Sequence, residues 1–174
     1  MKGYLAILCL FAFSCLGQDV FLIDKNESNF GKATTDEFTI YESQDNSISP
    51  EEFIRQKTSF EGKSLSENST TFDFTSSSLF LHFSIKNESE KDQSLVLETA
   101  RPFTNHIDLF CVETDETVLT GDAIPFDSKC LPTHVSALSL FVPSGESREY
   151  VLRIKAEGEN LNLPMVFYQV DEFL

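Results

Sequence analysis

Positive charge is scarce in this sequence. Of its 174 residues, 13 are lysine or arginine and 28 are aspartate or glutamate, which gives a formal net charge of −15. An acidic surface repels phosphate backbones and anionic lipid headgroups, so the composition argues against nucleic-acid binding and membrane-surface binding. Solubility is the simplest interpretation of the charge. The hydrophobic fraction of 41% suits one ordinary globular domain.

Motifs for catalysis and for metal binding are also missing. The three histidines, His82, His106 and His134, stand far apart, without the local ligand pairs of a structural zinc site. There is no Gly-x-Ser-x-Gly nucleophile elbow, and the seven glycines form no phosphate-binding loop. Two of the many acids could pair for glycoside cleavage, but nothing singles out such a pair. We therefore expect neither an enzyme nor a cofactor.

Long apolar runs are missing, and the one short run stands at the N-terminus. The sequence MKGYLAILCLFAFSCLGQ combines Lys2, an apolar run and a small-residue exit at Gly17, which is the plan of a secretory signal peptide. The run is shorter than the roughly 18 residues of a transmembrane helix, and no later segment supplies them. We predict a signal peptide over residues 1–17 and export to the periplasm or the extracellular space. A lipid anchor at Cys15 is the alternative.

Cysteine is the next scarce residue. Removal of the signal peptide also removes Cys9 and Cys15, and it leaves Cys111 and Cys130 in an oxidising compartment that permits a disulfide. The sequence leaves open whether these two pair or are separate, small hydrophobic side chains in the core.

Short strand-like segments are abundant. Residues 18–36 show no sustained period and predict a terminal arm. The segment EFTIYES from Glu37 alternates like a strand, and NSISPEEFIRQ predicts a short helix that Ser49 caps and Pro50 begins. Seven further strand-like segments follow, namely LFLHFSI, SLVLETA, HIDLFCV, ETVLTG, ALSLFV, EYVLRIKA and LPMVFYQV. Residues 37–174 therefore predict an all-β, jelly-roll-like β-sandwich with one short helix near its N-terminus.

Candidate ligand-binding side chains come from one face of LFLHFSI, from the segment after SLVLETA and from the loop after Thr120. Phe80 and His82 share one face of this strand, opposite the apolar face of Leu79, Leu81 and Phe83. Aromatic rings with a few convergent polar groups are how concave β-surfaces hold sugars or small organic anions. Spacing alone favours the plainer interpretation, in which these are core-edge and loop residues with structural partners. The candidates are Phe80, His82, Arg101, Asp122, Lys129 and His134.

The order of several motifs is more specific than any one of them. Together they resemble the extracellular domain type 2 of bacterial seven-transmembrane receptors with diverse intracellular signalling modules. The resemblance covers about residues 37–174. Its motifs are FLHF from Phe80, IDLF from Ile107, TGD with PF from Thr120 to Phe126, PSG from Pro143, and Tyr150 with Arg153.

The resemblance implies a jelly-roll domain similar to carbohydrate-binding modules, which serves outside the membrane as a non-catalytic sensory input. It implies that Asp122, Lys129 and His134 lie across the open face of the sandwich, toward Phe80 and His82, and bind a carbohydrate-like or small-molecule ligand. Family members usually carry arginines where this chain has His82, Lys129 and His134. Imidazole cannot copy a guanidinium fork, so recognition here could depend on pH.

Two expectations about partners remain open. Family members continue into seven membrane helices, whereas this sequence stops at QVDEFL. We therefore expect a free-standing sensor module or a truncated receptor fragment, with any membrane signalling partner encoded elsewhere. The alternative, from another class, is a periplasmic or surface protein that docks a protein partner and would present an exposed apolar patch.

Overall fold

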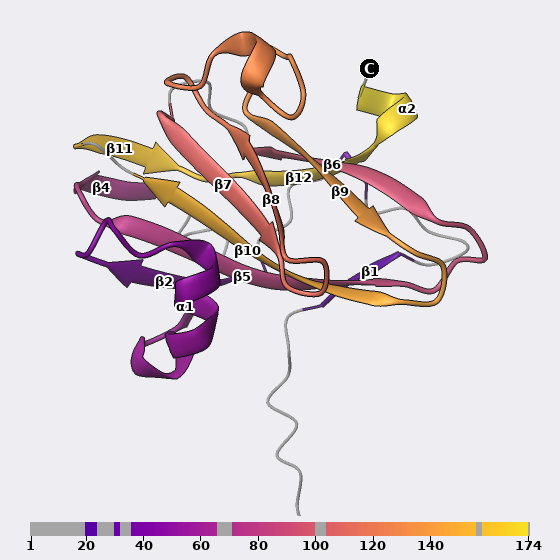
Figure 1. The fold of residues 1–174 in the computed structure, drawn as a ribbon, viewed down its shortest axis with the longest axis horizontal. Helices are drawn as coiled ribbons and strands as arrows, with labels where there is room; N and C mark the ends of the chain where they lie inside the picture. Colours follow the sequence, from indigo (N-terminus) through magenta and orange to yellow (C-terminus); the bar gives the residue numbers. More distant parts are fainter. Residues whose placement is uncertain are drawn as a thin grey trace, which may run out of the picture.

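The structure, a computed structural model, describes residues 20–23, 30–31, 36–65, 71–99, 104–155 and 158–173. These residues form an all-β sandwich, as the sequence predicts (Figure 1). Every strand predicted after Ser78 is present within a few residues of its expected bounds. The short strands β3, β4 and β11 were not predicted, because they lie in polar or irregular sequence.

The larger layer is a seven-stranded sheet with the order β3–β2–β5–β10–β7–β8, to which β1 is added beside β5. β1 pairs with β5 in parallel, with Val20 opposite Ser84, and the other neighbours are antiparallel. The predicted terminal arm therefore contains a sheet strand. The bounds are β1 Val20–Ile23, β2 Thr39–Ser43, β3 Lys63–Ser64, β5 Ser78–Asn87, β7 His106–Cys111, β8 Glu116–Thr120 and β10 Ser147–Lys155.

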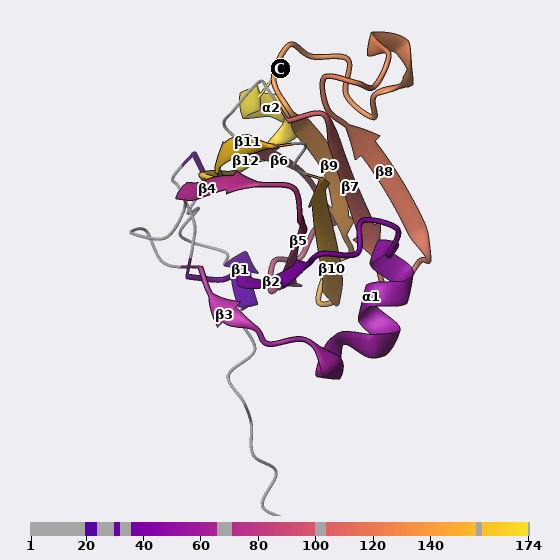
Figure 2. The same cartoon turned by 90° about the vertical axis from the view of Figure 1, so that its left-hand side faces the viewer.

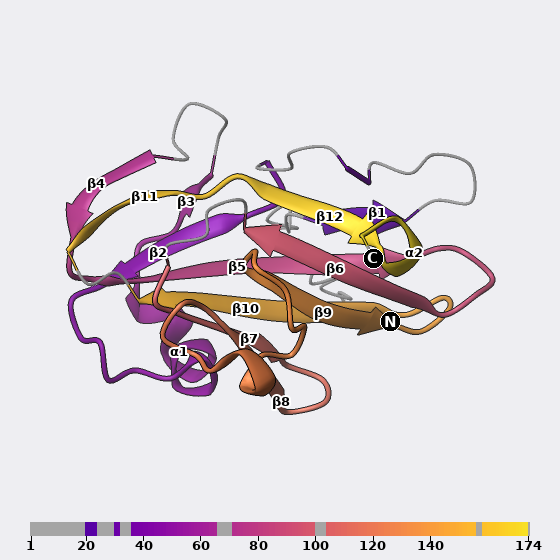
Figure 3. The ribbon, with the colours of Figure 1, turned by 90° about the horizontal axis from the view of Figure 1, so that it is seen from above.

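The second layer consists of two smaller antiparallel sheets. One has the order β12–β6–β9 and the other pairs β11 with β4. Seen from above, β12, β6 and β9 lie over the strands of the larger sheet (Figure 3). The bounds are β4 Thr71–Thr75, β6 Gln93–Thr99, β9 Ala137–Val142, β11 Glu159–Asn162 and β12 Met165–Gln169.

The main core fills the space between the layers. The face of β5 that the sequence assigns to the core is fully buried there, and it meets leucines of β6 and β9 together with Phe167 of β12. Burying this much aliphatic and aromatic surface is the main force that holds the two layers together. The inward residues of β5 are Leu79, Leu81, Phe83 and Ile85.

A short helix covers part of the outer face of the larger sheet (Figure 2). This helix, α1, spans Pro50–Gln56 and continues into the 3₁₀ turn η1, Lys57–Ser59. As predicted, Pro50 begins it and the Ser49 hydroxyl accepts a hydrogen bond from the Glu52 amide at 3.2 Å. Two smaller elements are η3, Phe126–Ser128, and α2, Val170–Phe173. No helix in the described ranges is long and apolar enough to cross a membrane.

Candidate functional site

Phe80 is a core residue beneath α1. Its ring is 0% exposed and stacks on the ring of Phe53 with centroids 4.4 Å apart. Tyr41 of β2 meets the edge of Phe53 at 5.1 Å, and Ile48 and Val151 complete this second apolar cluster. The predicted sidedness of β5 is confirmed, because Phe80 does face away from the main core. The helix occupies the surface that a ligand would need to reach its ring.

His82, two residues further along β5, is 5% exposed and has protein partners. Its Nε2 hydrogen-bonds Glu149 of β10, and the Nζ of Lys57 lies 3.2 Å from Nε2 and 3.3 Å from Nδ1. The Lys57 ammonium is also 3.9 Å from the Glu149 carboxylate. We call Lys57, His82 and Glu149 the clamp, because these side chains fasten the end of the helical segment to the sheet.

The electrostatics of the clamp follow from its geometry. The hydrogen bond from His82 lowers the pKa of Glu149, and the charge of Lys57 adds to this effect against the opposing effect of burial. Burial lowers the pKa of Lys57, and the Glu149 charge only partly offsets it. The carboxylate of Glu149 is therefore favoured by its two partners, whereas the ammonium of Lys57 loses more from burial than it gains from Glu149.

A second polar contact holds the start of α1. Arg153 of β10 pairs with Asp108 of β7, which is 7% exposed, and its Nη1 donates to the carbonyl oxygen of Ile48 at 2.7 Å. Glu51 of the helix also accepts from the Thr117 hydroxyl at 3.2 Å. The covered face thus has polar protein partners near both ends of the helical segment.

Three of the other predicted residues lie at a different end of the molecule. The loop 121–136 joins β8 to β9 and stands at the top of Figure 1, whereas α1 lies at the bottom. In this loop Asp122 and His134 are exposed, Lys129 is half-buried, and the His134 ring lies 5.9 Å from that of Phe126. The structure therefore groups Asp122, Lys129 and His134 apart from Phe80 and His82.

Arg101 lies outside the described residues. The ligand-binding role of the six predicted residues stays a prediction.

The Thr-Gly-Asp motif has a structural explanation. Gly121 has φ of +126°, in the region that favours glycine, and a Cβ there would lie 2.3 Å from the carbonyl oxygen of Asn105. The next amide, of Asp122, donates to the Thr104 carbonyl at 2.9 Å. The motif therefore anchors the loop tightly against the segment that enters β7.

Cys111 and Cys130 are free, half-buried thiols. Cys111 ends β7 opposite Glu116, whereas the Cys130 amide bonds to the carbonyl of Leu119, further along β8. The two thiols therefore pack separately at the edge of the main core.

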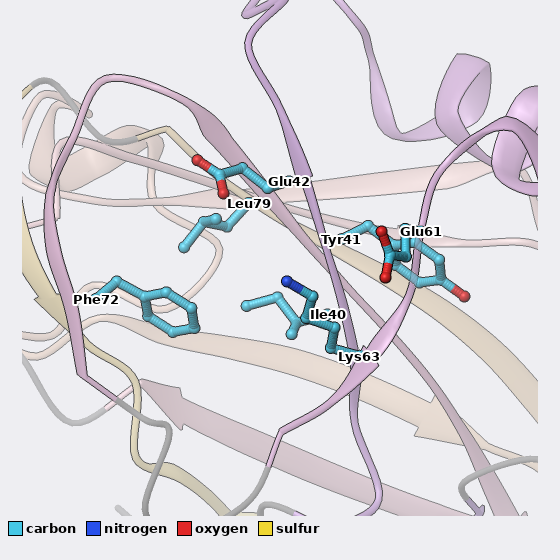
Figure 4. Close-up of a pocket in the computed structure, with 7 residues that line it drawn as sticks. All are labelled: Ile40, Tyr41, Glu42, Glu61, Lys63, Phe72 and Leu79. Carbon is cyan, nitrogen blue, oxygen red and sulfur yellow. The ribbon is translucent and has the colours of Figure 1, made fainter.

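A pocket that the sequence did not predict opens between β2 and the short strands β3 and β4. It has a volume of about 250 Å³ and lies between β2, β3, β4 and the start of β5 (Figure 4). Ile40 and Leu79 are buried side chains of its wall, and the half-buried ring of Phe72 faces them. The lining residues are Ile40, Tyr41, Glu42, Glu61, Lys63, Phe72 and Leu79.

The charged side chains that the structure describes in this pocket, unlike those of the clamp, are not paired with one another. No ion pair in the part of the chain that the structure describes involves Lys63, Glu42 or Glu61. Glu42 does accept a hydrogen bond from Thr75 at 3.4 Å. The aromatic wall includes Tyr41, against whose ring the backbone of Gly62 packs so closely that a Cβ there would lie 2.7 Å away.

The sequence did not reveal the pocket because three of its seven lining residues come from a region without a clear pattern. Alternation in EFTIYES places Ile40 and Tyr41 on opposite faces of a strand, but Lys63 and Phe72 stand in a Ser/Thr-rich stretch. Gly62, directly before β3, is a local signal of a close backbone approach.

Comparison with known proteins gives the chain a family. The family model described as 7TMR-DISM extracellular 2 matches residues 35–169, which is most of the chain. A comparison with curated proteins finds no match to this sequence. The β-sandwich and the ordered motifs agree with the family match. The chain therefore belongs to the family of type 2 extracellular sensor domains of seven-transmembrane receptors.

Proposed function

We propose that this domain is an exported, non-catalytic sensory input module that binds a small molecule in the pocket between β2, β3 and β4. The observation that carries the proposal is the cavity of about 250 Å³, walled by aromatic, aliphatic and charged side chains. Small-molecule sites are concave, mostly apolar and supplied with a few polar groups, and their volumes begin near 300 Å³. A ligand of one sugar ring or a small organic acid suits this size.

The way the pocket wall is held supports binding to a preformed site. Glu61 and Lys63 belong to a strap, residues 57–65, that leads from η1 into β3 and then to buried Leu65. The clamp holds one end of this strap at Lys57, and pairing of Lys63 with Ile40 of β2 holds the other. A wall fixed at both ends loses little conformational freedom on binding, which favours affinity for a small ligand.

Protein docking, the alternative expected from the sequence, has less support. The large apolar side chains that are exposed in the described residues are Leu22, Leu119, Phe126 and Phe141. They come from β1, β8, η3 and β9, which belong to two different sheets and a loop. Single exposed hydrophobic residues are normal on soluble proteins, and a docking site needs a contiguous patch.

A thermal-shift screen of the purified protein against sugars, peptidoglycan fragments and small organic acids tests the proposal. A ligand that binds the native state raises the melting temperature, by an amount that grows with its concentration. Phe72→Ala removes a ring that faces the pocket and is expected to abolish the shift. Phe141→Ala, which removes an exposed ring from β9, is the matched control and should keep it. A shift that survives Phe72→Ala unchanged contradicts the proposed site.

A further inference from the structure

From the charges of this pocket we infer that its ligand is a small monocarboxylate that also carries hydroxyl or amino hydrogen-bond donors. The inference rests on the proposed function and adds the chemical class of the ligand. Two sources share this chemistry, namely sugar acids and amino acids.

The ammonium group of Lys63 favours a ligand that carries a negative charge. In Figure 4 its ammonium group points to the side of the pocket where Leu79 and Phe72 lie. Lys63 is exposed and no ion pair in the described ranges involves it, so its ammonium is open to a ligand. A ligand carboxylate would supply a charge-assisted hydrogen bond, which is stronger than a bond between neutral groups.

The carboxylates of Glu42 and Glu61 favour a ligand that also carries hydrogen-bond donors. Carboxylates only accept hydrogen bonds when ionised, so they suit the hydroxyls of a sugar or the ammonium of an amino acid. Both line the pocket together with Lys63. A ligand with one carboxylate and several donors satisfies all three groups, whereas a simple fatty acid satisfies Lys63 alone.

Size and charge exclude larger anions. A phosphate ester or a polyanion would place two or more negative charges against one lysine and two carboxylates, on a protein of formal net charge −15. The like charges would repel it. The apolar surface of Ile40, Leu79 and Phe72 suits the carbon face of one sugar ring or one short aliphatic side chain.

Titration calorimetry on the purified protein tests the inference with pairs of compounds that differ in the carboxylate. Glucuronate is compared with glucose for the first source, and valine with valinamide for the second. We expect the carboxylate of at least one pair to bind at least tenfold more tightly than its neutral or amide counterpart. Lys63→Gln should weaken that binding about tenfold or more, which is the effect of losing one charge-assisted bond.

Lys91→Gln is the control, since Lys91 is an exposed lysine in the turn between β5 and β6. It should leave the affinity unchanged, and both variants should melt at the temperature of the parent protein. If glucose binds as tightly as glucuronate, valinamide binds as tightly as valine and Lys63→Gln has no effect, the carboxylate class is wrong while the sensor role survives. If no compound of either pair or of the earlier screen binds, both proposals fail together.

Discussion

The clamp and the pocket use the same kinds of residue for opposite purposes. Each has a lysine and at least one glutamate beside aromatic rings, and both lysines come from the short stretch from η1 to β3. In the clamp, Lys57 is within hydrogen-bond distance of His82 and near Glu149, so the protein itself satisfies the charges. In the pocket, Lys63 and Glu61 have no ion-pair partner among the described residues. The clamp and the proposed binding surface therefore differ in the pairing of their charges and not in composition.

The largest expected effect comes from the apolar cluster beside the clamp. Phe53→Ala removes a ring that is 0% exposed and stacked on Phe80, so the free energy of unfolding should fall by about 3–5 kcal/mol. Phe72→Ala, in the pocket, removes a half-buried ring and should cost about 1–2 kcal/mol. Urea unfolding measures both. Equal losses would mean that the pocket wall is core rather than binding surface.

The buried ion pair under α1 gives the next effect. Asp108→Ala leaves the guanidinium of Arg153 buried without its carboxylate, which should cost about 3 kcal/mol. The matched control is Glu146→Ala, because Glu146 pairs with Arg148 at 2.7 Å while its side chain is 51% exposed. An exposed pair contributes about 0–1 kcal/mol. A loss of similar size in the two variants would show that the covered face is open to water.

These two predictions also mark how far the sequence alone could go. Alternation in LFLHFSI was enough to separate Leu79 and Leu81 from Phe80 and His82, since period and sidedness are local properties. The contact between α1 and the second face of β5, in contrast, joins residues that are far apart in the sequence. Ser49 and Pro50 predict where α1 begins, but nothing in the helix sequence says that Phe53 will stack on Phe80.

The same limit applies to the candidate site. The family resemblance suggested that His134 and Lys129 lie toward His82, whereas the chain turns at Gly121 and holds the loop against Thr104 and Asn105. The pocket depends on contacts between distant parts of the chain. Lys63 reaches Ile40 through the pairing of β3 with β2, and the intervening sequence has no period that predicts this pairing.

The pH dependence of stability should also distinguish Glu149 of the clamp from the glutamates of the pocket. The pKa of Glu149 is lowered in the folded protein, so its contribution is present above the ordinary carboxyl pKa and is lost as pH falls through the lowered value. Glu149→Gln should therefore cost about 1 kcal/mol at pH 7, and the difference from the parent should shrink below about pH 4.5. Urea unfolding between pH 3 and pH 7 measures the difference. If this difference stayed constant from pH 3 to pH 7, the proposed role of Glu149 in the clamp would be wrong. Glu61→Gln, measured in the same way, is the control for a carboxylate in the pocket.

The two lysines should give the smallest effects and the clearest contrast. Lys57→Gln removes the ammonium that lies 3.3 Å from Nδ1 of His82, the ring nitrogen that can accept from it, so a loss of about 1 kcal/mol is expected. Lys63→Gln removes an exposed charge that has no ion-pair partner in the described ranges, and its free energy of unfolding should stay within about 0.5 kcal/mol of the parent. Ligand affinity should show the reverse order, with Lys63→Gln the more damaging change. If Lys63→Gln destabilised the protein as much as Lys57→Gln, the charge of Lys63 would already have a partner within the protein, and the argument for a ligand carboxylate would lose its basis.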